Sequence, residues 1–185
     1  MTCFLLPKTV SNGVEGETLP ICDSLTEYLT TMTIPDHSST YCSINELIHL
    51  HKMTFTTVLS LGIDMNHGED SSYSLIIDAT SSLDLSLLNR QSRHGALISM
   101  MRGSTTSSSI QYLYKLCSSY HEVYVCKPES DCQLNDTKYI VALDFIHMPD
   151  THNLSIPYYF RMKLEDINSV LGQLQLEYLR MKKEV

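Results

Sequence analysis

Hydrophobic residues in this chain gather into short continuous runs, and polar stretches separate those runs. Runs of four to eight apolar or β-branched residues between turn-forming segments are typical of strands that are covered on both faces. Five segments have this pattern and are predicted as strands: TFTTVLSLGI (54–63), YSLIIDA (73–79), ALISMM (96–101), VYVCKP (123–128) and KYIVALDF (138–145). Pro128 cannot donate a hydrogen bond to a neighbouring strand, so the fourth strand should end there.

Other segments repeat their apolar positions every three or four residues, which indicates helices. SINELIHLHK (43–52) begins with a serine cap and has Glu46 three residues later, which is typical of a helix start. A shorter helix is predicted from Leu83 to Arg93, where Gly95 would end it in a left-handed conformation. SIQYLYKLCSSY (109–120) predicts a third helix, whereas SLTEYLTTMTI (24–34) fits a helix or a strand.

Strands that alternate with helices predict an α/β fold, with a mostly parallel sheet and helices on both of its faces. Residues 1–22 contain many turn formers and are expected to form an irregular N-terminal lead. Residues 23–160 would then form the α/β domain. Residues 161–185 would form a separate amphipathic helix at the C-terminus.

The C-terminal helix has the most regular apolar stripe in the chain. Its members recur every three or four residues over five turns, which indicates a helix with one apolar face. Such a face packs either on its own sheet or on a protein partner, which could be a second copy of the chain. We treat six residues as the candidate partner-binding surface: Leu164, Ile167, Leu171, Leu174, Tyr178 and Met181.

Composition indicates one globular domain of 185 residues, with 43% hydrophobic and 18% charged residues. A formal net charge of −8 disfavours strong RNA binding by this chain alone, because phosphate contacts supply most of that affinity. The apolar runs are too short for a secretory signal or a membrane span, so we expect no membrane association.

The cysteines are scattered without a CxxC pair, which favours reduced thiols in an intracellular, reducing compartment and no metal site. His49 and His51 lie two residues apart on the predicted helix and would not share a face, so they do not suggest a metal site either. The six cysteines are Cys3, Cys22, Cys42, Cys117, Cys126 and Cys132.

Residues 95–145 carry a resemblance to a known family. A strand ending in Asp78 precedes Gly95 and its strand, and Lys127-Pro128, Asn135 and Tyr139 then follow in register. This order resembles the second half of the FtsJ-like RNA 2′-O-methyltransferases, particularly the mRNA cap methyltransferases. The resemblance implies a Rossmann-like sheet in which strand 138–145 runs antiparallel between strands 96–101 and 123–128.

Catalysis in that family uses a Lys-Asp-Lys-Glu tetrad, in which a lysine helps to deprotonate the ribose 2′-hydroxyl. The resemblance places its aspartate on Asp78, the lysine of its G-G-x-F-V-x-K segment on Met100 and its glutamate on Thr137. Methionine cannot accept a proton, and threonine cannot carry the balancing charge. Asp78 is then the relic of a catalytic residue, or it only caps the following turn, which is the commoner role of aspartate there.

The family holds its cofactor, S-adenosylmethionine, at a glycine-rich turn after the first strand. No glycine lies between Gly16 and Gly62, and the turn PDHSST (35–40) after YLTTMTI (28–34) is bulky. Asp64 is the only acid placed to meet a ribose in the exit loop of the second strand. We therefore expect no bound cofactor.

Three functions remain open on these patterns. The first is a catalytically degenerate methyltransferase-like subunit that scaffolds or stimulates an RNA capping or modifying enzyme, as occurs in some viral capping complexes. Such a subunit would act in the host cytoplasm if the chain is viral. The second is an active RNA 2′-O-methyltransferase that uses S-adenosylmethionine. The third is a structural domain of a ribonucleoprotein or viral assembly.

Overall fold

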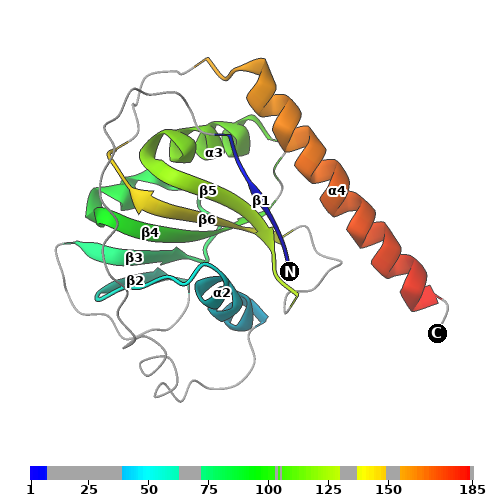
Figure 1. Ribbon diagram of the computed structural model, residues 1–185, viewed down its shortest axis with the longest axis horizontal. Coiled ribbons are helices and arrows are strands. Elements are labelled where there is room, and N and C mark those ends of the chain that lie inside the picture. The colour runs from blue at the N-terminus through cyan, green and yellow to red at the C-terminus, as the bar shows by residue number, and fades with distance from the viewer. Residues whose placement is uncertain are drawn as a thin grey trace.

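A computed structural model describes residues 1–7, 39–62, 72–102, 104, 106–129, 137–148 and 155–183 of this chain. Within these residues, six strands form a single sheet in the order β1-β5-β6-β4-β3-β2 (Figure 1). The strands are β1 (Thr2–Leu5), β2 (Val58–Leu61), β3 (Tyr73–Asp78), β4 (Gln91–Arg102), β5 (Tyr120–Lys127) and β6 (Thr137–Phe145).

The sheet is mixed rather than mostly parallel, which corrects part of the prediction. The β2–β3 and β3–β4 pairs are parallel, whereas β4–β6, β5–β6 and β1–β5 are antiparallel. The predicted position of the last strand is confirmed, because β6 lies between β4 and β5 and is antiparallel to both. Val141 of β6 is opposite Ile98 of β4, and its neighbour Ile140 is opposite Val125 of β5.

Helices cover both faces of the sheet, as predicted. Helix α2 (Ser39–Leu50) starts before the predicted serine cap and packs on one face, whereas α3 (Ser107–Ser119) and α4 (Tyr158–Lys183) pack on the other (Figure 1). We call the two buried clusters the α2-side core and the α3-side core. The α2-side core includes Ile44, Leu47, Ile48, Leu75, Ile77, Ile98, Tyr139 and Val141. The α3-side core includes Leu97, Tyr112, Leu113, Leu116, Phe160, Leu164, Ile167 and Leu171.

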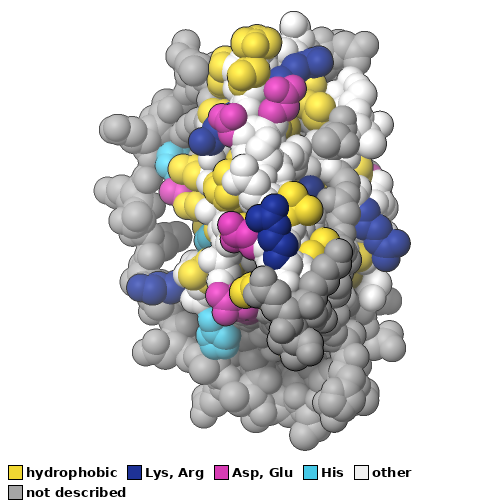
Figure 2. Space-filling model, turned by 90° about the vertical axis from the view of Figure 1, so that its right-hand side faces the viewer, with side chains coloured by type: hydrophobic (Ala, Val, Ile, Leu, Met, Phe, Trp, Pro, Cys, Tyr) yellow, Lys and Arg dark blue, Asp and Glu magenta, His cyan; other side chains and the backbone are white. Residues whose placement is uncertain are grey.

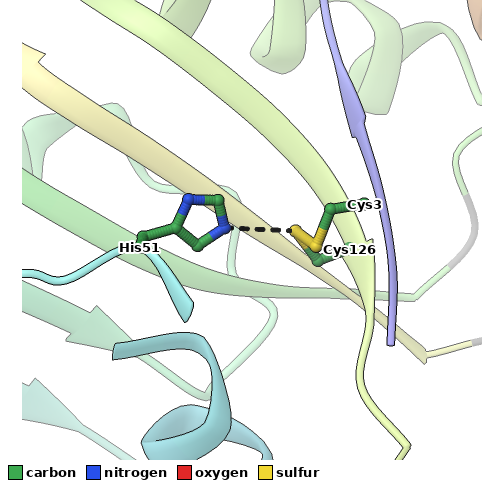
Figure 3. Close-up of side chains that lie close together, drawn as sticks. All are labelled: Cys3, His51 and Cys126. Carbon is green, nitrogen blue, oxygen red and sulfur yellow. Dashed lines mark hydrogen bonds between the residues drawn. A yellow bond between two sulfur atoms is a disulfide. The ribbon is translucent and has the colours of Figure 1, made fainter. Parts of the chain in front are cut away.

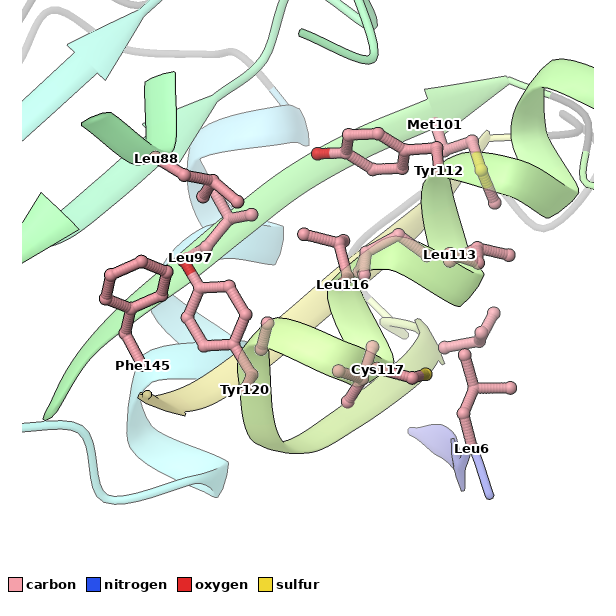
Figure 4. Packing of buried hydrophobic residues seen from close by; sticks show 14 of the residues in the cluster. Leu6, Leu88, Leu97, Met101, Tyr112, Leu113, Leu116, Cys117, Tyr120 and Phe145 are labelled. Atoms are coloured by element: carbon pink, nitrogen blue, oxygen red, sulfur yellow. The ribbon is translucent and has the colours of Figure 1, made fainter. Parts of the chain in front are cut away.

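The α3-side core is built around the predicted helix at 109–120. The side-chain oxygen of Thr106 accepts a hydrogen bond from the Ser109 amide at 3.1 Å and so caps the first turn of α3. Leu113 and Leu116 of α3 are buried in one cluster with Leu97 of β4, and Leu116 lies nearer to Leu97 (Figure 4). The helix continues directly into β5, so its apolar stripe and the adjoining strand are packed as one unit.

The segment predicted as a helix from Leu83 to Arg93 is mostly not α-helical. It forms a short 3-10 helix, η1 (Leu85–Arg90), and β4 already begins at Gln91. Between Tyr73↔Gln91 and Leu75↔Ala96, two steps along β3 correspond to five along β4, so β4 bulges out of register. The left-handed residue in the bulge is His94, with φ 61°, so Gly95 is not a helix cap.

Gly95 is required by close packing instead. The Gln91 carboxamide donates a hydrogen bond from Nε2 to the Tyr73 carbonyl at 2.9 Å. Its Oε1 accepts a hydrogen bond from the Tyr120 hydroxyl at 3.1 Å. All three side chains are buried. A Cβ atom at Gly95 would lie 2.0 Å from Gln91 Nε2, so any larger residue must displace this carboxamide.

We expect Gly95→Ala to lower the free energy of unfolding by about 1–3 kcal/mol, the cost of leaving buried polar groups unpaired. The added Cβ would also lie 2.9 Å from the carbonyl oxygens of Ser74 and Ser92, which cannot move as a side chain can. Gly172→Ala in α4 is the matched control, because nothing lies within 4 Å of its added Cβ. Helix propensity predicts a gain of up to about 1 kcal/mol there. Urea denaturation of both variants checks this, and equal midpoints would contradict it.

The expectation of an irregular N-terminal lead is wrong for the first residues. Thr2–Leu5 form β1, which pairs with β5 at the edge of the sheet. The remainder of that lead from residue 8 onward, and the ambiguous segment 24–34, lie outside the described residues. Among the described helices, none has the length and apolar content to cross a membrane.

Candidate functional site

Asp78 lies at the carboxyl end of β3, where the sequence predicted a strand to end. Its Oδ1 accepts a hydrogen bond from the Thr80 amide at 2.9 Å and another from the Thr80 hydroxyl. Its Oδ2 accepts from the Ser82 hydroxyl at 3.1 Å. The residue is only 1% exposed. These bonds hold the turn after β3, so the carboxylate serves as a cap and does not face solvent.

The two other tetrad positions that the resemblance places in this chain lie on the opposite face of the sheet. Asp78 is directly opposite Ser99 in the β3–β4 ladder, so the next residue, Met100, points to the other face. Met100 packs against the α2-side core. Thr137 is two residues before Tyr139, which also belongs to the α2-side core. The structure therefore brings Met100 and Thr137 to one face and leaves Asp78 on the other.

The surroundings of Asp78 on the α3 side are polar but deeply buried. Ser99 is fully buried directly opposite Asp78, and Tyr112 of α3 is buried in the same core. Burial raises the pKa of Tyr112, and the nearby carboxylates of Asp78 and Asp84 raise it further. The Tyr112 phenol is therefore neutral at ordinary pH and does not provide a base.

Two buried lysines lie where β5 ends and β6 begins. Lys127, which the sequence marked through its Lys-Pro pair, donates from Nζ to the Thr137 carbonyl at 2.8 Å. Lys138 donates from Nζ to the Ser104 hydroxyl at 2.9 Å, and Ser104 in turn donates to Asn168 of α4. The motifs of the sequence do not identify Lys138, although a lysine at the start of an apolar strand is a usable signal. Together these bonds join β5 to β6 and β6 to α4.

The exit of β2 is the part of the expected cofactor region that can be described. Gly62 follows β2 with φ 78°, and a Cβ there would lie 3.2 Å from the Ala79 carbonyl carbon and 3.2 Å from Thr80 Cγ2. The glycine therefore permits close packing against the turn after β3. Asp64 and Asn135 lie outside the described residues, as do residues 35–38 of the bulky turn.

A sulfur cluster lies at the β1–β5 edge of the sheet, on the side of the α2-side core. Cys3 of β1 and Cys126 of β5 are directly paired in the ladder, with Cα atoms 4.1 Å apart, and form a disulfide. This corrects the expectation of reduced thiols for these two residues. Cys42 and Cys117 keep their thiols. No local sequence pattern reveals the pair, because 123 residues separate its members.

His51 completes the cluster. It follows the last residue of α2, so His49 and His51 do not lie on one helix as expected. Its Nε2 is 3.8 Å from Cys126 Sγ and points toward the disulfide (Figure 3). Its ring lies 4.7 Å from the Tyr124 ring. Burial lowers the pKa of His51, and the charge of Glu122 partly opposes that shift.

Helix α4 divides the predicted partner-binding stripe in two. Leu164, Ile167 and Leu171 are buried in the α3-side core, so their assignment to a partner surface is corrected. Beyond them, Leu174 is 38% exposed, Tyr178 is half-buried and Met181 is 61% exposed. We call residues 174–181 the distal half of α4.

The face of the molecule that carries α4 is chemically mixed. Hydrophobic side chains lie among lysine, arginine, aspartate and glutamate side chains and do not form one continuous patch (Figure 2). The distal half also carries two exposed leucines, Leu176 and Leu179, which lie off the stripe on other sides of the helix. A partner that binds here would meet apolar contacts with a charged rim.

The fold and these sites together define an α/β protein with a six-stranded mixed sheet, and its described residues do not assemble the tetrad on one face. A scan against protein-family models finds no family that matches this chain, and a search of curated proteins finds no match either.

Proposed function

We propose that this protein is a catalytically degenerate, methyltransferase-like subunit that scaffolds or stimulates an RNA capping or modifying enzyme. The observation that carries the proposal is the exposed apolar distal half of α4. The apolar stripe of α4 continues beyond Leu171, the last of its residues that is buried on the sheet. Leu174 and Met181 in the continuation are much more exposed to solvent than Leu171. Action inside a cell, in the cytoplasm of a host if the chain is viral, is part of this proposal.

The sheet supports the methyltransferase-like part. In the FtsJ-like family that residues 95–145 resemble, the last strand inserts antiparallel between its two predecessors. Here β6 lies antiparallel between β4 and β5, next to the parallel β3–β4 pair. This arrangement supports the resemblance at the level of topology, in the same residues that carry the sequence motifs.

The tetrad positions support the degenerate part. Asp78 is buried and bonded to its own turn, and the residues at the lysine and glutamate positions are Met100 and Thr137. These two also point away from the face of Asp78. A methyl transfer needs a base beside the ribose hydroxyl, and this arrangement offers none at those positions.

The length of α4 supports the scaffolding part. Its 26 residues span about 39 Å at a rise of ~1.5 Å per residue. The side chains of the first half fill the α3-side core, so the domain already has its stabilising contact. Exposed leucines in the distal half contribute nothing to that core, and apolar side chains grouped on one helix are a common docking element.

An experiment that introduces charge into the stripe tests the scaffolding role. The double variant Leu174→Glu with Met181→Glu adds two carboxylates to the exposed part of the stripe. We expect recovery of an RNA-modifying partner in affinity purification to fall at least about 30-fold. That loss corresponds to a total of about 2 kcal/mol, which one interface hot spot can supply. The control is Ser169→Glu with Gln173→Glu, which adds the same charge on the opposite side of α4. Quantitative mass spectrometry of both purifications provides the measurement.

Each other function predicts a different result. Equal recovery with both double variants would contradict docking through the distal half. Sedimentation of the purified chain shows whether the partner is a second copy. If the active enzyme is correct, S-adenosylmethionine at a hundred times its dissociation constant should stabilise the fold by about 2.7 kcal/mol. Partners that are lost on ribonuclease treatment would favour the ribonucleoprotein alternative.

A further inference from the structure

The cluster of Cys3, His51 and Cys126 has the composition of a metal site. One ligand atom of each residue lies within 4.8 Å of the others. Two sulfurs and one imidazole nitrogen are soft or borderline ligands, which suit zinc and disfavour magnesium or calcium. We propose that the reduced form of this cluster binds one zinc ion through Cys3 Sγ, Cys126 Sγ and His51 Nε2.

The distance between His51 and Cys126 already fits such a site. Bond lengths of about 2.3 Å for zinc to sulfur and about 2.0 Å for zinc to nitrogen, at a tetrahedral angle, place the two ligand atoms about 3.5 Å apart. Nε2 and Sγ are 3.8 Å apart in the structure. The imidazole and this sulfur therefore need almost no movement to hold the ion.

Cys3 is the ligand that must move. Two thiolates on one tetrahedral zinc ion are about 3.8 Å apart, whereas the two sulfurs are bonded to each other here. The residues are directly paired on neighbouring strands, so a rotation about the Cys3 side chain separates the sulfurs without moving the sheet. The Cys126 side chain is fully buried and stays in place.

The ligands come from three segments that other contacts already hold together. Cys3 belongs to β1, Cys126 to β5, and His51 follows α2. The Glu46 side chain of α2 accepts a hydrogen bond from the Glu129 amide just after β5, at 3.1 Å. The ring of Tyr124 lies against His51 and restrains its orientation. Zinc would therefore fasten β1 and the end of α2 to the sheet, with the fourth position open to water.

Oxidation state decides which form is present. A thiol reductant of the cell cleaves the disulfide by supplying two electrons and two protons, and it becomes a disulfide itself. Zinc then replaces one proton on each cysteine, so binding releases two protons. In a reducing compartment the metal form is favoured, and in an oxidising one the disulfide form. This proposal does not depend on the docking role of α4.

Cobalt provides a direct probe of the proposal. The full chain is reduced with a phosphine under anaerobic conditions and titrated with Co²⁺, with absorption in the cobalt–thiolate charge-transfer region as the readout. Cys22, Cys42 and Cys132 are replaced by serine in every sample, because Cys22 and Cys132 lie outside the described residues and Cys42 is exposed. We expect one equivalent of Co²⁺ to bind and one equivalent of Zn²⁺ to displace it.

Single variants in that background identify the ligands. Cys3→Ser, Cys126→Ser and His51→Gln should each weaken Co²⁺ binding at least about 10-fold, because even the loss of a residue that only orients a metal ligand costs that much. His49→Gln is the matched control, since His49 is exposed on α2 and should leave the affinity unchanged. No charge-transfer band in the reduced parent chain, or a band that survives both cysteine variants, would overturn the proposal.

Alkylation gives a second measurement that needs no ligand variant. Zinc should protect the half-buried Cys3 of the reduced wild-type chain from iodoacetamide, whereas the exposed Cys42 should be modified at the same rate with and without the metal. Peptide mass spectrometry quantifies each site. If zinc does not change the rate at Cys3, the reduced pair holds no metal, and the cluster is only a disulfide beside a histidine.

Discussion

Leu171→Asp is expected to lower the free energy of unfolding by several kcal/mol. Leu171 is 4% exposed in the α3-side core. Truncation of a buried leucine to alanine alone costs about 2–5 kcal/mol, and aspartate adds the cost of a buried, unpaired carboxylate. A domain of this size has a total stability of about 5–15 kcal/mol, so this loss consumes much of it. Circular dichroism during urea denaturation measures the change.

Leu176→Asp is the control for that experiment. It makes the same chemical change in the same helix, but Leu176 is 55% exposed. Exposed substitutions usually change stability by about 0.5 kcal/mol or less. If Leu171→Asp were as stable as Leu176→Asp, the first half of α4 would not be packed on the domain, and the whole stripe would return as a candidate partner surface.

The second large effect is the absence of methyl transfer to RNA. We expect the purified chain to transfer no labelled methyl group from S-adenosylmethionine to capped RNA. One reason is the missing general base, because its loss alone lowers the rate by a factor of about 10²–10⁴. Met100→Lys with Thr137→Glu should not restore transfer. The reason is geometric, because both side chains lie on the face opposite Asp78, so the restored groups would not meet the aspartate.

Turnover by the unmodified chain would contradict this prediction, provided that Asp78→Asn abolishes it. This substitution keeps the size of the side chain and one oxygen acceptor for the turn after β3, so a loss of activity would point to chemistry and not to unfolding. Denaturation of the same variant checks that the fold is intact. Activity that survives Asp78→Asn would instead indicate a contaminating enzyme.

Five of the six described strands and the three described α-helices were predictable because their patterns are local. Buried strands such as β3 and β6 are continuous apolar runs, and α3 repeats its leucines at helical spacing. The prediction of a helix at residues 83–93 was wrong. The leucines there have helical spacing, but they pack around a short 3-10 helix; they are Leu83, Leu85, Leu87 and Leu88. The bulge that follows depends on where Gln91 and Gly95 meet β3, and no local pattern contains that contact.

The candidate sites were less predictable than the fold. Position-by-position transfer from a motif located Asp78, Met100 and Thr137 along the chain, but their side chains alternate between faces in a way that only the observed register defines. The sulfur cluster had no local signal, because Cys3 and Cys126 meet only when β1 pairs with β5.

By itself, the sequence determined the periodicity of each element. Apolar side chains spaced two residues apart share one face of a strand, and those spaced three or four apart share one face of a helix, so that burying this face favours the element. The sequence thereby specified an α/β chain with an apolar strand β6 and a striped helix α4. The tertiary structure alone decided which half of that stripe is covered, because Leu171 and Leu174 have the same chemistry and differ only in what lies opposite them. It also decided that His51 meets two cysteines, since strand pairing brings together residues that chain length keeps apart.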